Sequence, residues 1–163
     1  MKTVVLNEKE ILRICNRFAF QILENSTDSD IIHIVGIKEK GFEIAKLIEN
    51  ELKCISEKTI LLRSIKINKN NPKDSVLSDL KSNEKIDMIF LIDDVLNTGK
   101  TLIYSLSFLL KFNFKSIKTL VLIDRNHKQF PVKVDYKGIS LSTNISDNIK
   151  LLTDNTKLKA VLF

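Results

Sequence analysis

Two adjacent acidic residues and a threonine-glycine turn stand close together near the middle of the chain. The acids, Asp93 and Asp94, follow the apolar run 88–92, and the turn T-G-K-T occupies positions 98–101. Carboxylates can accept hydrogen bonds from sugar hydroxyls. The turn offers backbone N–H groups, two hydroxyls and the start of a helix, which together suit a phosphate. This combination predicts a ligand that carries both hydroxyls and a phosphate, such as a phosphorylated sugar.

Two other interpretations of this segment compete with a sugar-phosphate site. Positions 94–101 read D-x-x-x-x-G-K-T, which differs from the nucleotide-binding P-loop only at its first residue. An aspartate there adds a side chain and a negative charge where the backbone must fold closely around a polyphosphate, which disfavours a P-loop. In a purely structural interpretation, the acids only end a strand and Thr98 or Thr101 only caps a helix. Two acids beside T-G-K-T fit that interpretation poorly.

Helix-like and strand-like segments alternate along the chain and would position the acids. A continuous apolar run such as 88–92 is typical of a strand that is buried on both faces of a parallel sheet, and ligands bind at the carboxyl ends of such strands. The alternation predicts one α/β domain, 1–163, with a parallel sheet flanked by helices. The Asn- and Lys-rich segment 68–85 is expected to be a mobile loop. We expect helices at 8–24 and 42–54, and a third helix that follows the strand at 88–92 and ends at about 112. The expected strands are 30–35, 59–67, 88–92, 116–123 and 158–163. Irregular structure is expected at 124–145.

Composition narrows the class of protein without identifying it. The chain has 163 residues, of which 44% are hydrophobic and 28% are charged, as is typical of a soluble globular domain. No run approaches the roughly 20 apolar residues that span a bilayer, and the N-terminus lacks a signal peptide, so a cytoplasmic protein is expected. Cys15 and Cys54 lack metal-like spacing and are expected to be buried or semi-buried thiols. A net charge of +6 is compatible with binding to nucleic acid or to an anionic small ligand, and it does not distinguish between them.

The sequence IFLIDDVLNTGKT resembles the motif with which type I phosphoribosyltransferases bind phosphoribosyl pyrophosphate (PRPP). In that family the two acids hold the ribose hydroxyls and the loop holds the 5′-phosphate. The resemblance implies the fold of that family, with a small hood over the carboxyl ends of the strands at about 124–145. It also implies a Mg²⁺ ion that bridges pyrophosphate and ribose oxygens. Carried over, Asp93 and Asp94 clamp the ribose, and the phosphate loop comprises Asn97, Thr98, Gly99, Lys100 and Thr101.

Two further segments resemble the subfamily of bifunctional pyrimidine-operon attenuators and uracil phosphoribosyltransferases. In that subfamily a G-I-K-x-x-G turn holds the pyrophosphate, and a D-R-x-H segment builds the hood over the base. The resemblance implies that Lys38 acts with the two acids in catalysis and that Arg125 helps to define the base pocket. For Arg125 an ion pair to Asp124 or Asp135 is the structural alternative, and His127 is expected to have a structural role. The pyrophosphate turn comprises Gly36, Ile37, Lys38, Glu39, Lys40 and Gly41.

Asn97 bears on the choice of base. Purine-using relatives carry an acid at this position, near the imidazole nitrogen of the base, whereas asparagine cannot exchange a proton near neutral pH. The residue argues against a 6-oxopurine, and the hood segment favours uracil. We therefore expect an enzyme that joins uracil to PRPP and, like its relatives, forms a homo-oligomer. An RNA-binding regulator of pyrimidine genes and a PRPP- or nucleotide-sensing protein with little turnover remain as alternatives.

Two departures from the subfamily pattern affect these expectations. The flexible loop of the subfamily carries an arginine followed by acids, but 68–85 contains no arginine, so Lys69 or Lys73 would have to supply the charge. Phe20 stands where the first helix of the attenuators has a histidine. The first departure predicts reduced activity, and the second makes RNA binding the weaker expectation.

Overall fold

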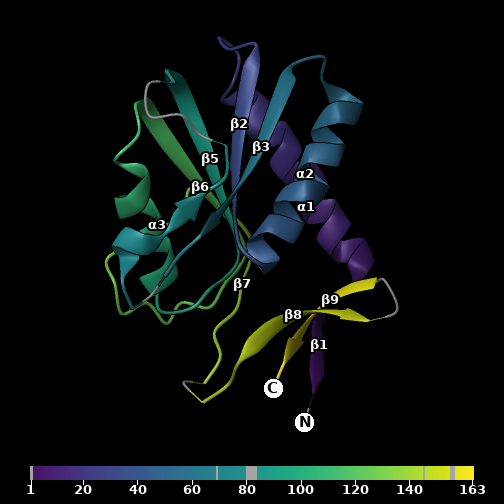
Figure 1. The fold of residues 1–163 in the computed structure, drawn as a ribbon. Coiled ribbons are helices and arrows are strands. Elements are labelled where there is room, and N and C mark those ends of the chain that lie inside the picture. Colours follow the sequence, from purple (N-terminus) through teal and green to yellow (C-terminus); the bar gives the residue numbers. More distant parts are fainter. Residues whose placement is uncertain (1, 69, 80–83, 145, 155–156) are drawn as a thin grey trace.

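The computed structural model describes residues 2–68, 70–79, 84–144, 146–154 and 157–163 (Figure 1). Within these residues, six strands form the main sheet in the order β4-β3-β2-β5-β6-β7. Strand β4 pairs antiparallel with β3, and the other neighbours pair in parallel. The strands are β2 (Ile31–Ile37), β3 (Thr59–Lys66), β4 (Val76–Leu77), β5 (Ile86–Leu96), β6 (Phe114–Asp124) and β7 (Tyr136–Ser140).

Helices cover both faces of this sheet, as the sequence predicts. Helices α1 (Glu8–Glu24) and α2 (Lys40–Ile55) lie on one face, and α3 (Lys100–Leu109) lies on the other (Figure 1). Strand β5 shows why both faces need a cover, because successive side chains of a strand point to opposite sides. Phe90 and Ile92 pack in the core beneath α1 and α2, whereas Ile89 and Leu91 pack on the α3 side.

Helix α1 has the expected bounds 8–24 and begins with a capping box. The Asn7 side chain accepts a hydrogen bond from the backbone N–H of Glu10 (3.0 Å), and the Glu10 carboxylate accepts one from the N–H of Asn7 (2.8 Å). Along the helix, Cys15 is buried, and this burial raises the pKa of its thiol to about 12. Cys54 is exposed, so the expectation of two buried or semi-buried thiols is wrong for this residue, which lies near the end of α2.

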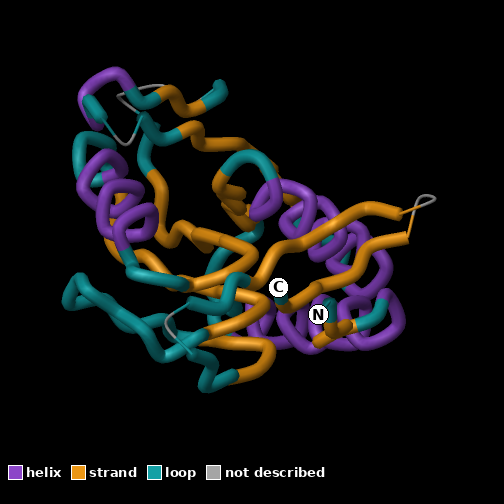
Figure 2. The backbone as a smooth tube through the Cα atoms, turned by 90° about the horizontal axis from the view of Figure 1, so that it is seen from below, coloured by secondary structure: helices purple, strands orange, loops and turns teal. Residues whose placement is uncertain are grey.

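A second, smaller sheet lies beyond the carboxyl ends of the main strands (Figures 1 and 2). Its described strands are β1 (Thr3–Leu6), β8 (Ile149–Asp154) and β9 (Lys157–Leu162), antiparallel and in the order β1-β9-β8. Strand β9 is close to the expected strand at 158–163, but β1 and β8 were not expected. The two ends of the chain thus build one element together.

The irregular hood expected at 124–145 needs correction. Residues Tyr136–Ser140 form β7, which pairs in parallel with β6 and extends the main sheet. Part of the expected loop 68–85 is also ordered, because residues 72–74 form a 3₁₀ turn and β4 pairs with β3. Lys69, a candidate to replace the missing arginine of that loop, lies outside the described residues. In the part of the chain that is described, no helix has the length and apolar character needed to cross a membrane.

Candidate functional site

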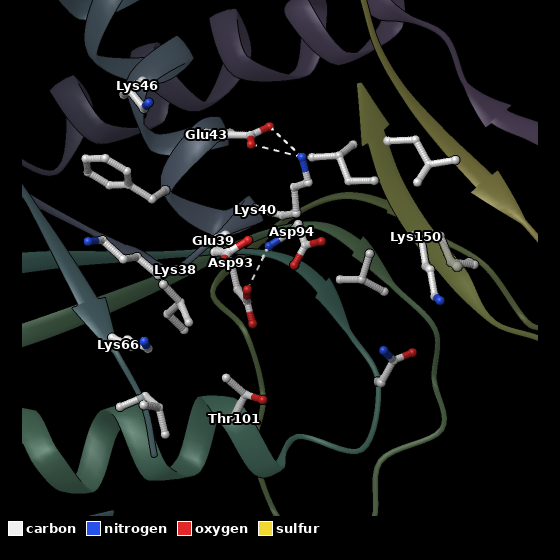
Figure 3. Close-up of a pocket in the computed structure, with 18 residues that line it drawn as sticks. Lys38, Glu39, Lys40, Glu43, Lys46, Lys66, Asp93, Asp94, Thr101 and Lys150 are labelled. Carbon is white, nitrogen blue, oxygen red and sulfur yellow. Dashed lines mark hydrogen bonds and ion pairs between the residues drawn. The ribbon is translucent and has the colours of Figure 1, made fainter. Parts of the chain in front are cut away.

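A cleft opens where the central strands separate. Strand β2 pairs with β5 only as far as Gly36 and Ile92, whereas β5 stays paired with β6 up to Leu96. Beyond Ile92, one side of β5 therefore faces a cleft of about 1010 Å³ (Figure 3). Asp93 and Asp94 lie within the extended strand rather than after it, but on this open stretch, as predicted for ligand-binding acids at the carboxyl edge.

The two acids lie in the middle of the cleft, between the turn that starts α2 and Thr101 of α3 (Figure 3). Asp93 is only 8% exposed, and its Oδ1 accepts a hydrogen bond from the backbone N–H of Asp94 (2.9 Å). The backbone amide thereby holds the Asp93 carboxylate in a fixed orientation. Asp94 is half-buried and forms no ion pair with a described residue, which leaves its carboxylate available to a ligand.

The predicted pyrophosphate turn forms another wall of the same cleft. Ile37, Lys38, Glu39 and Lys40 line it, and the peptide bond between Lys38 and Glu39 is cis. The Lys40 ammonium is held by the Glu43 carboxylate at 2.9 and 3.0 Å, whereas Lys38 forms no ion pair with any residue that the structure describes. Lys38 is therefore the more available of the two cations.

Glycines bring this turn close to the acids. A Cβ atom at Gly41 would lie 2.8 Å from the carbonyl oxygen of Ile92 and 2.9 Å from the Cα of Asp93. Only glycine permits this approach of α2 to β5. Gly36 and Gly41 are both buried and shape the wall from beneath rather than lining the cleft.

Three lysines that the sequence analysis did not single out for this site also line the cleft. Lys46 of α2 and Lys66 of β3 lie on the same side as Lys38, and Lys150 of β8 lies opposite (Figure 3). Lys66 is the last residue of β3, which pairs in parallel with β2, and it lies near the end of the strand expected at 59–67, so its position at the same edge could have been inferred. Lys150 could not, because β8 was not expected. The cationic walls suit an anionic ligand.

The predicted phosphate loop contributes to the cleft with its two ends. Asn97 and Thr101 line the cleft, and Thr98, Gly99 and Lys100 make the turn between them. Gly99 has a φ of 85°, in the left-handed region that favours glycine, and precedes the first residue of α3. The side chain of Thr98 accepts a hydrogen bond from the N–H of Lys100 (3.3 Å). The loop therefore starts α3 beside the acids, as the motif predicts.

Arg125, the predicted base-binding residue, does not line the cleft. It is 6% exposed, and its Nη1 donates to Oδ1 of Asn97 at 2.7 Å. Its Nε and Nη2 donate to the Thr143 hydroxyl at 3.1 and 2.8 Å. Nη2 also donates to the carbonyls of Asn144 (3.2 Å) and Asp147 (2.8 Å). A direct contact between Arg125 and a base stays a prediction.

The alternative ion pairs of Arg125 are not formed. Asp124 pairs with Lys128 at 3.2 Å, and Asp135 pairs with Lys118 at 3.4 Å. The ring of His127 contacts the carbonyl of Thr143, which is the structural role expected for it. The segment after β6 is thus tied to the loop that leads into β8.

Comparisons with known proteins agree with this geometry. A family model described as "Phosphoribosyl transferase domain" matches residues 3–154. A protein named "Bifunctional protein PyrR" from Clostridium kluyveri is 32% identical over 152 residues, covering 88% of this chain and 86% of the relative. Its namesake from Haemophilus ducreyi is 29% identical over 164 residues, covering 95% and 92%.

Solved structures show the same fold at low identity. A hypoxanthine phosphoribosyltransferase from Staphylococcus aureus has a TM-score of 0.72 at 19% identity, covering 88% of this chain and 80% of its own. The Trypanosoma cruzi enzyme, in complex with the product IMP, has a TM-score of 0.67 at 18% identity, covering 85% and 79%. The family match extends over most of the sequence and confirms the resemblance to phosphoribosyltransferases, whereas the roles of the paired acids and the T-G-K-T turn stay predictions. The chain therefore belongs to the phosphoribosyltransferase domain family.

Proposed function

We propose that the protein transfers the 5-phosphoribosyl group of PRPP to uracil and releases uridine monophosphate and pyrophosphate. One observation carries the proposal: Asp93, Asp94 and Lys38 open into one cleft beside the start of α3. The cleft thus offers groups for a sugar diol, a phosphate and a diphosphate together. The relatives named PyrR and the D-R-x-H segment support uracil among the bases.

The proposed roles follow from the charges that change during transfer. As the bond from the anomeric carbon to pyrophosphate breaks, positive charge develops on the ribose ring and negative charge on the leaving group. Asp93 and Asp94 hold the ribose hydroxyls and face the positive charge, while Lys38 and Lys66 stabilise the departing pyrophosphate. Lys40 contributes less than Lys38, because Glu43 already neutralises its ammonium.

The 5′-phosphate is assigned to the start of α3. The first N–H groups of a helix lack partners within the helix, and the helix dipole places partial positive charge there. The hydroxyl of Thr101 lies in the cleft, and Thr98 and Gly99 shape the turn. Binding of ribose and phosphate at fixed positions holds the anomeric carbon in place for attack by the base.

A Mg²⁺ ion fits this cleft only together with its substrate. Among the described residues, no group of three or more His, Cys, Asp or Glu side chains could hold a metal ion. Mg²⁺ prefers one or two carboxylates combined with substrate phosphates, which Asp93, Asp94 and the diphosphate of PRPP would provide. When bound, the ion supplies positive charge to the leaving pyrophosphate.

A panel of nucleobases tests the proposed function. Release of pyrophosphate from PRPP is measured with uracil, cytosine, adenine, guanine and hypoxanthine, with Mg²⁺ present and absent. We expect uracil to support the fastest release and removal of Mg²⁺ to stop it. Release only with a purine would reject uracil. Binding of PRPP without release for any base would favour the sensing protein with little turnover.

RNA binding is a second candidate. The relatives are named bifunctional, and the outer side of α1 exposes Arg13 and Arg17, whereas the exposed Phe20 beside them lacks the charge of the histidine expected there. Arg17 is partly engaged, because its guanidinium donates to the carbonyls of Lys137 (3.2 Å) and Gly138 (2.9 Å). Gel shifts with the leader of the pyrimidine operon, with and without uridine nucleotides, test it. A lack of nucleotide-dependent binding would end this proposal.

A homo-oligomeric state and a cytoplasmic location are also proposed, by likeness to the family. Sedimentation of the purified chain measures its mass in solution, and a monomer at micromolar concentration would contradict the first. Fractionation of the source cells tests the second. Neither property is needed for the cleft described above, so the nucleobase panel does not depend on them.

A further inference from the structure

The side-chain amide of Asn97 has a defined orientation. Its partner at 2.7 Å is Nη1 of Arg125, and a guanidinium can only donate hydrogen bonds. The atom of the amide that faces Arg125 must therefore be the oxygen. The amide nitrogen, which carries two N–H donors and no acceptor, is left on the other side of the group.

Backbone hydrogen bonds from segment 125–130 hold the residues directly before and directly after Asn97. The N–H of Arg125 donates to the carbonyl of Leu96 (3.1 Å), directly before Asn97. Directly after it, the carbonyl of Thr98 accepts hydrogen bonds from the N–H groups of Gln129 (2.8 Å) and Phe130 (3.0 Å). The side chain that orients the amide and the backbone that carries it are thus fixed by the same segment, 125–130.

Asn97 lines the cleft, whereas Arg125 lies behind it and is buried. The amide nitrogen of Asn97 has no hydrogen-bond partner among the residues that the structure describes. On this basis we propose that Asn97 selects the base by donating a hydrogen bond to it and that Arg125 is the positioning residue that aims this donor. This proposal deepens the proposed function and rests on it for the identity of the base.

The polarity of this donor restricts the ligand. A base must present a hydrogen-bond acceptor at this position, such as a carbonyl oxygen of uracil. A base that presents an N–H group there would meet a second donor and leave both unpaired, which costs binding free energy. Arg125 also binds Thr143, Asn144 and Asp147, just before β8, so it fixes Asn97 relative to the opposite wall of the cleft.

Replacing Asn97 by aspartate tests the donor directly. The carboxylate has the same shape and still accepts from Arg125, but it presents an oxygen to the cleft in place of the N–H groups. Calorimetry of the full chain gives dissociation constants for uridine, inosine and guanosine monophosphates and for ribose 5-phosphate, which lacks a base. The ratio of the ribose 5-phosphate constant to that of a nucleotide measures the contribution of the base. We expect Asn97→Asp to lower this ratio about 10-fold or more for the best-bound nucleotide.

A matched control separates polarity from added charge. Asn113 is exposed and precedes β6 at the opposite edge of the sheet, so Asn113→Asp makes the same chemical change away from the cleft. Its ratio should equal that of the unchanged chain. The inference would be overturned if the ratio for Asn97→Asp stayed within twofold of the ratio for the unchanged chain. It would also be overturned if the unchanged chain bound no nucleotide more tightly than ribose 5-phosphate. If an inosine or guanosine nucleotide binds best, uracil is rejected while the Asn97 comparison still applies.

Arg125→Met tests the positioning role. Without the guanidinium the amide of Asn97 can turn, so the base contribution should fall, and adding Asn97→Asp should then have a smaller effect than in the unchanged chain. A merely structural Arg125 would leave the ratio unchanged in the folded protein and the two effects additive, which would overturn this part. If thermal melting shows that Arg125→Met does not fold, Asn97→Asp alone decides whether the donor selects the base.

Discussion

The sheet carries two polar clusters that are built in opposite ways. On the α3 side, His33, Arg63 and Glu84 form an inner cluster that is paired within the chain, except at the buried Nε of Arg63, which has no hydrogen-bond partner among the described residues. Nη1 of Arg63 lies 2.8 Å from Nδ1 of His33, and its Nη2 lies 2.9 and 3.1 Å from the Glu84 carboxylate oxygens. In the cleft, Lys38 and Asp94 face open space and form no ion pair with a described residue.

This difference separates groups that support folding from groups that await a ligand. Buried polar groups that are paired inside the chain stabilise the fold relative to a structure in which one partner is missing. Charges that face a cleft without partners contribute little to the fold and are available for binding. Substitutions in the inner cluster should therefore lower stability without changing PRPP affinity, and substitutions in the cleft should do the reverse.

The largest effect is expected for Arg63→Met. The change leaves His33 and Glu84 without their central partner, and because Arg63 is buried, the free energy of unfolding should fall by about 2–4 kcal/mol. Denaturant unfolding measures this loss, and calorimetry of PRPP on the folded variant should give an unchanged affinity. Lys115→Met, which breaks the exposed pair to Asp87, is the control and should leave the unfolding midpoint in place. A weakened PRPP affinity in folded Arg63→Met would remove the distinction between the clusters.

Asp94→Asn is the corresponding change in the cleft. It keeps the shape of the side chain but removes the charge that would hold a ribose hydroxyl, so the dissociation constant of PRPP should rise about 10- to 100-fold. The melting temperature should stay the same or rise. Asp28→Asn, an exposed residue in the turn before β2, removes one charge at the opposite edge of the sheet and should not change PRPP binding. An unchanged affinity in Asp94→Asn would show that the ribose binds elsewhere.

The inner part of the main sheet and its three helices could be predicted from local sequence patterns. Run 88–92 is apolar because both faces of β5 are covered, and the helical spacing of apolar residues in 8–24 matches the buried side of α1. The sequence also predicts the acids and the T-G-K-T turn at the carboxyl edge, where the structure has them, although the acids lie within β5 rather than after it. In each case the information lies within a few adjacent residues.

The missed parts depend on contacts between distant segments. Strand β1 exists because it pairs with β9, from Thr3 opposite Leu162 to Leu6 opposite Ala160, and four residues alone give no such signal. Strand β7 forms by parallel pairing with β6, although its segment suggested irregular structure. The bond from Arg125 to Asn97 joins residues that are 28 positions apart. A local pattern identifies both residues but not their contact.

Lys66→Ala tests a cleft residue that local patterns left out. Lys66 extends the cationic side of the cleft that contains Lys38, so its loss should weaken binding of pyrophosphate about 3- to 10-fold at low salt and less at high salt. Lys40→Ala should weaken binding less, because Glu43 already pairs with Lys40. Isothermal titration with pyrophosphate compares them. A larger loss for Lys40→Ala would show that its ion pair opens to the ligand.

The smallest expected effect is a pH dependence of stability in the inner cluster. Burial lowers the pKa of His33, and the Arg63 guanidinium lowers it further, against weaker opposing effects of Glu84 and Asp87. Since Arg63 donates to Nδ1, a proton on that atom would remove the hydrogen bond and place two cations together. The folded chain therefore binds this proton less readily than the unfolded chain, in which the histidine has a pKa of about 6.5.

The contribution of His33 to stability is fully present above the unfolded pKa and is lost as the pH falls through the lowered folded pKa. His33→Gln keeps a neutral acceptor for Arg63 but cannot be protonated. Between pH 7 and pH 5 the unfolding free energy of the unchanged chain should fall more steeply than that of the variant, and carboxylates and His127, present in both, cancel in the difference. Equal slopes would mean that His33 accepts its proton as readily in the fold as outside it. The inner cluster would then accept a positive charge on His33 beside Arg63 without loss of stability. Charges without a partner would no longer be a property of the cleft alone.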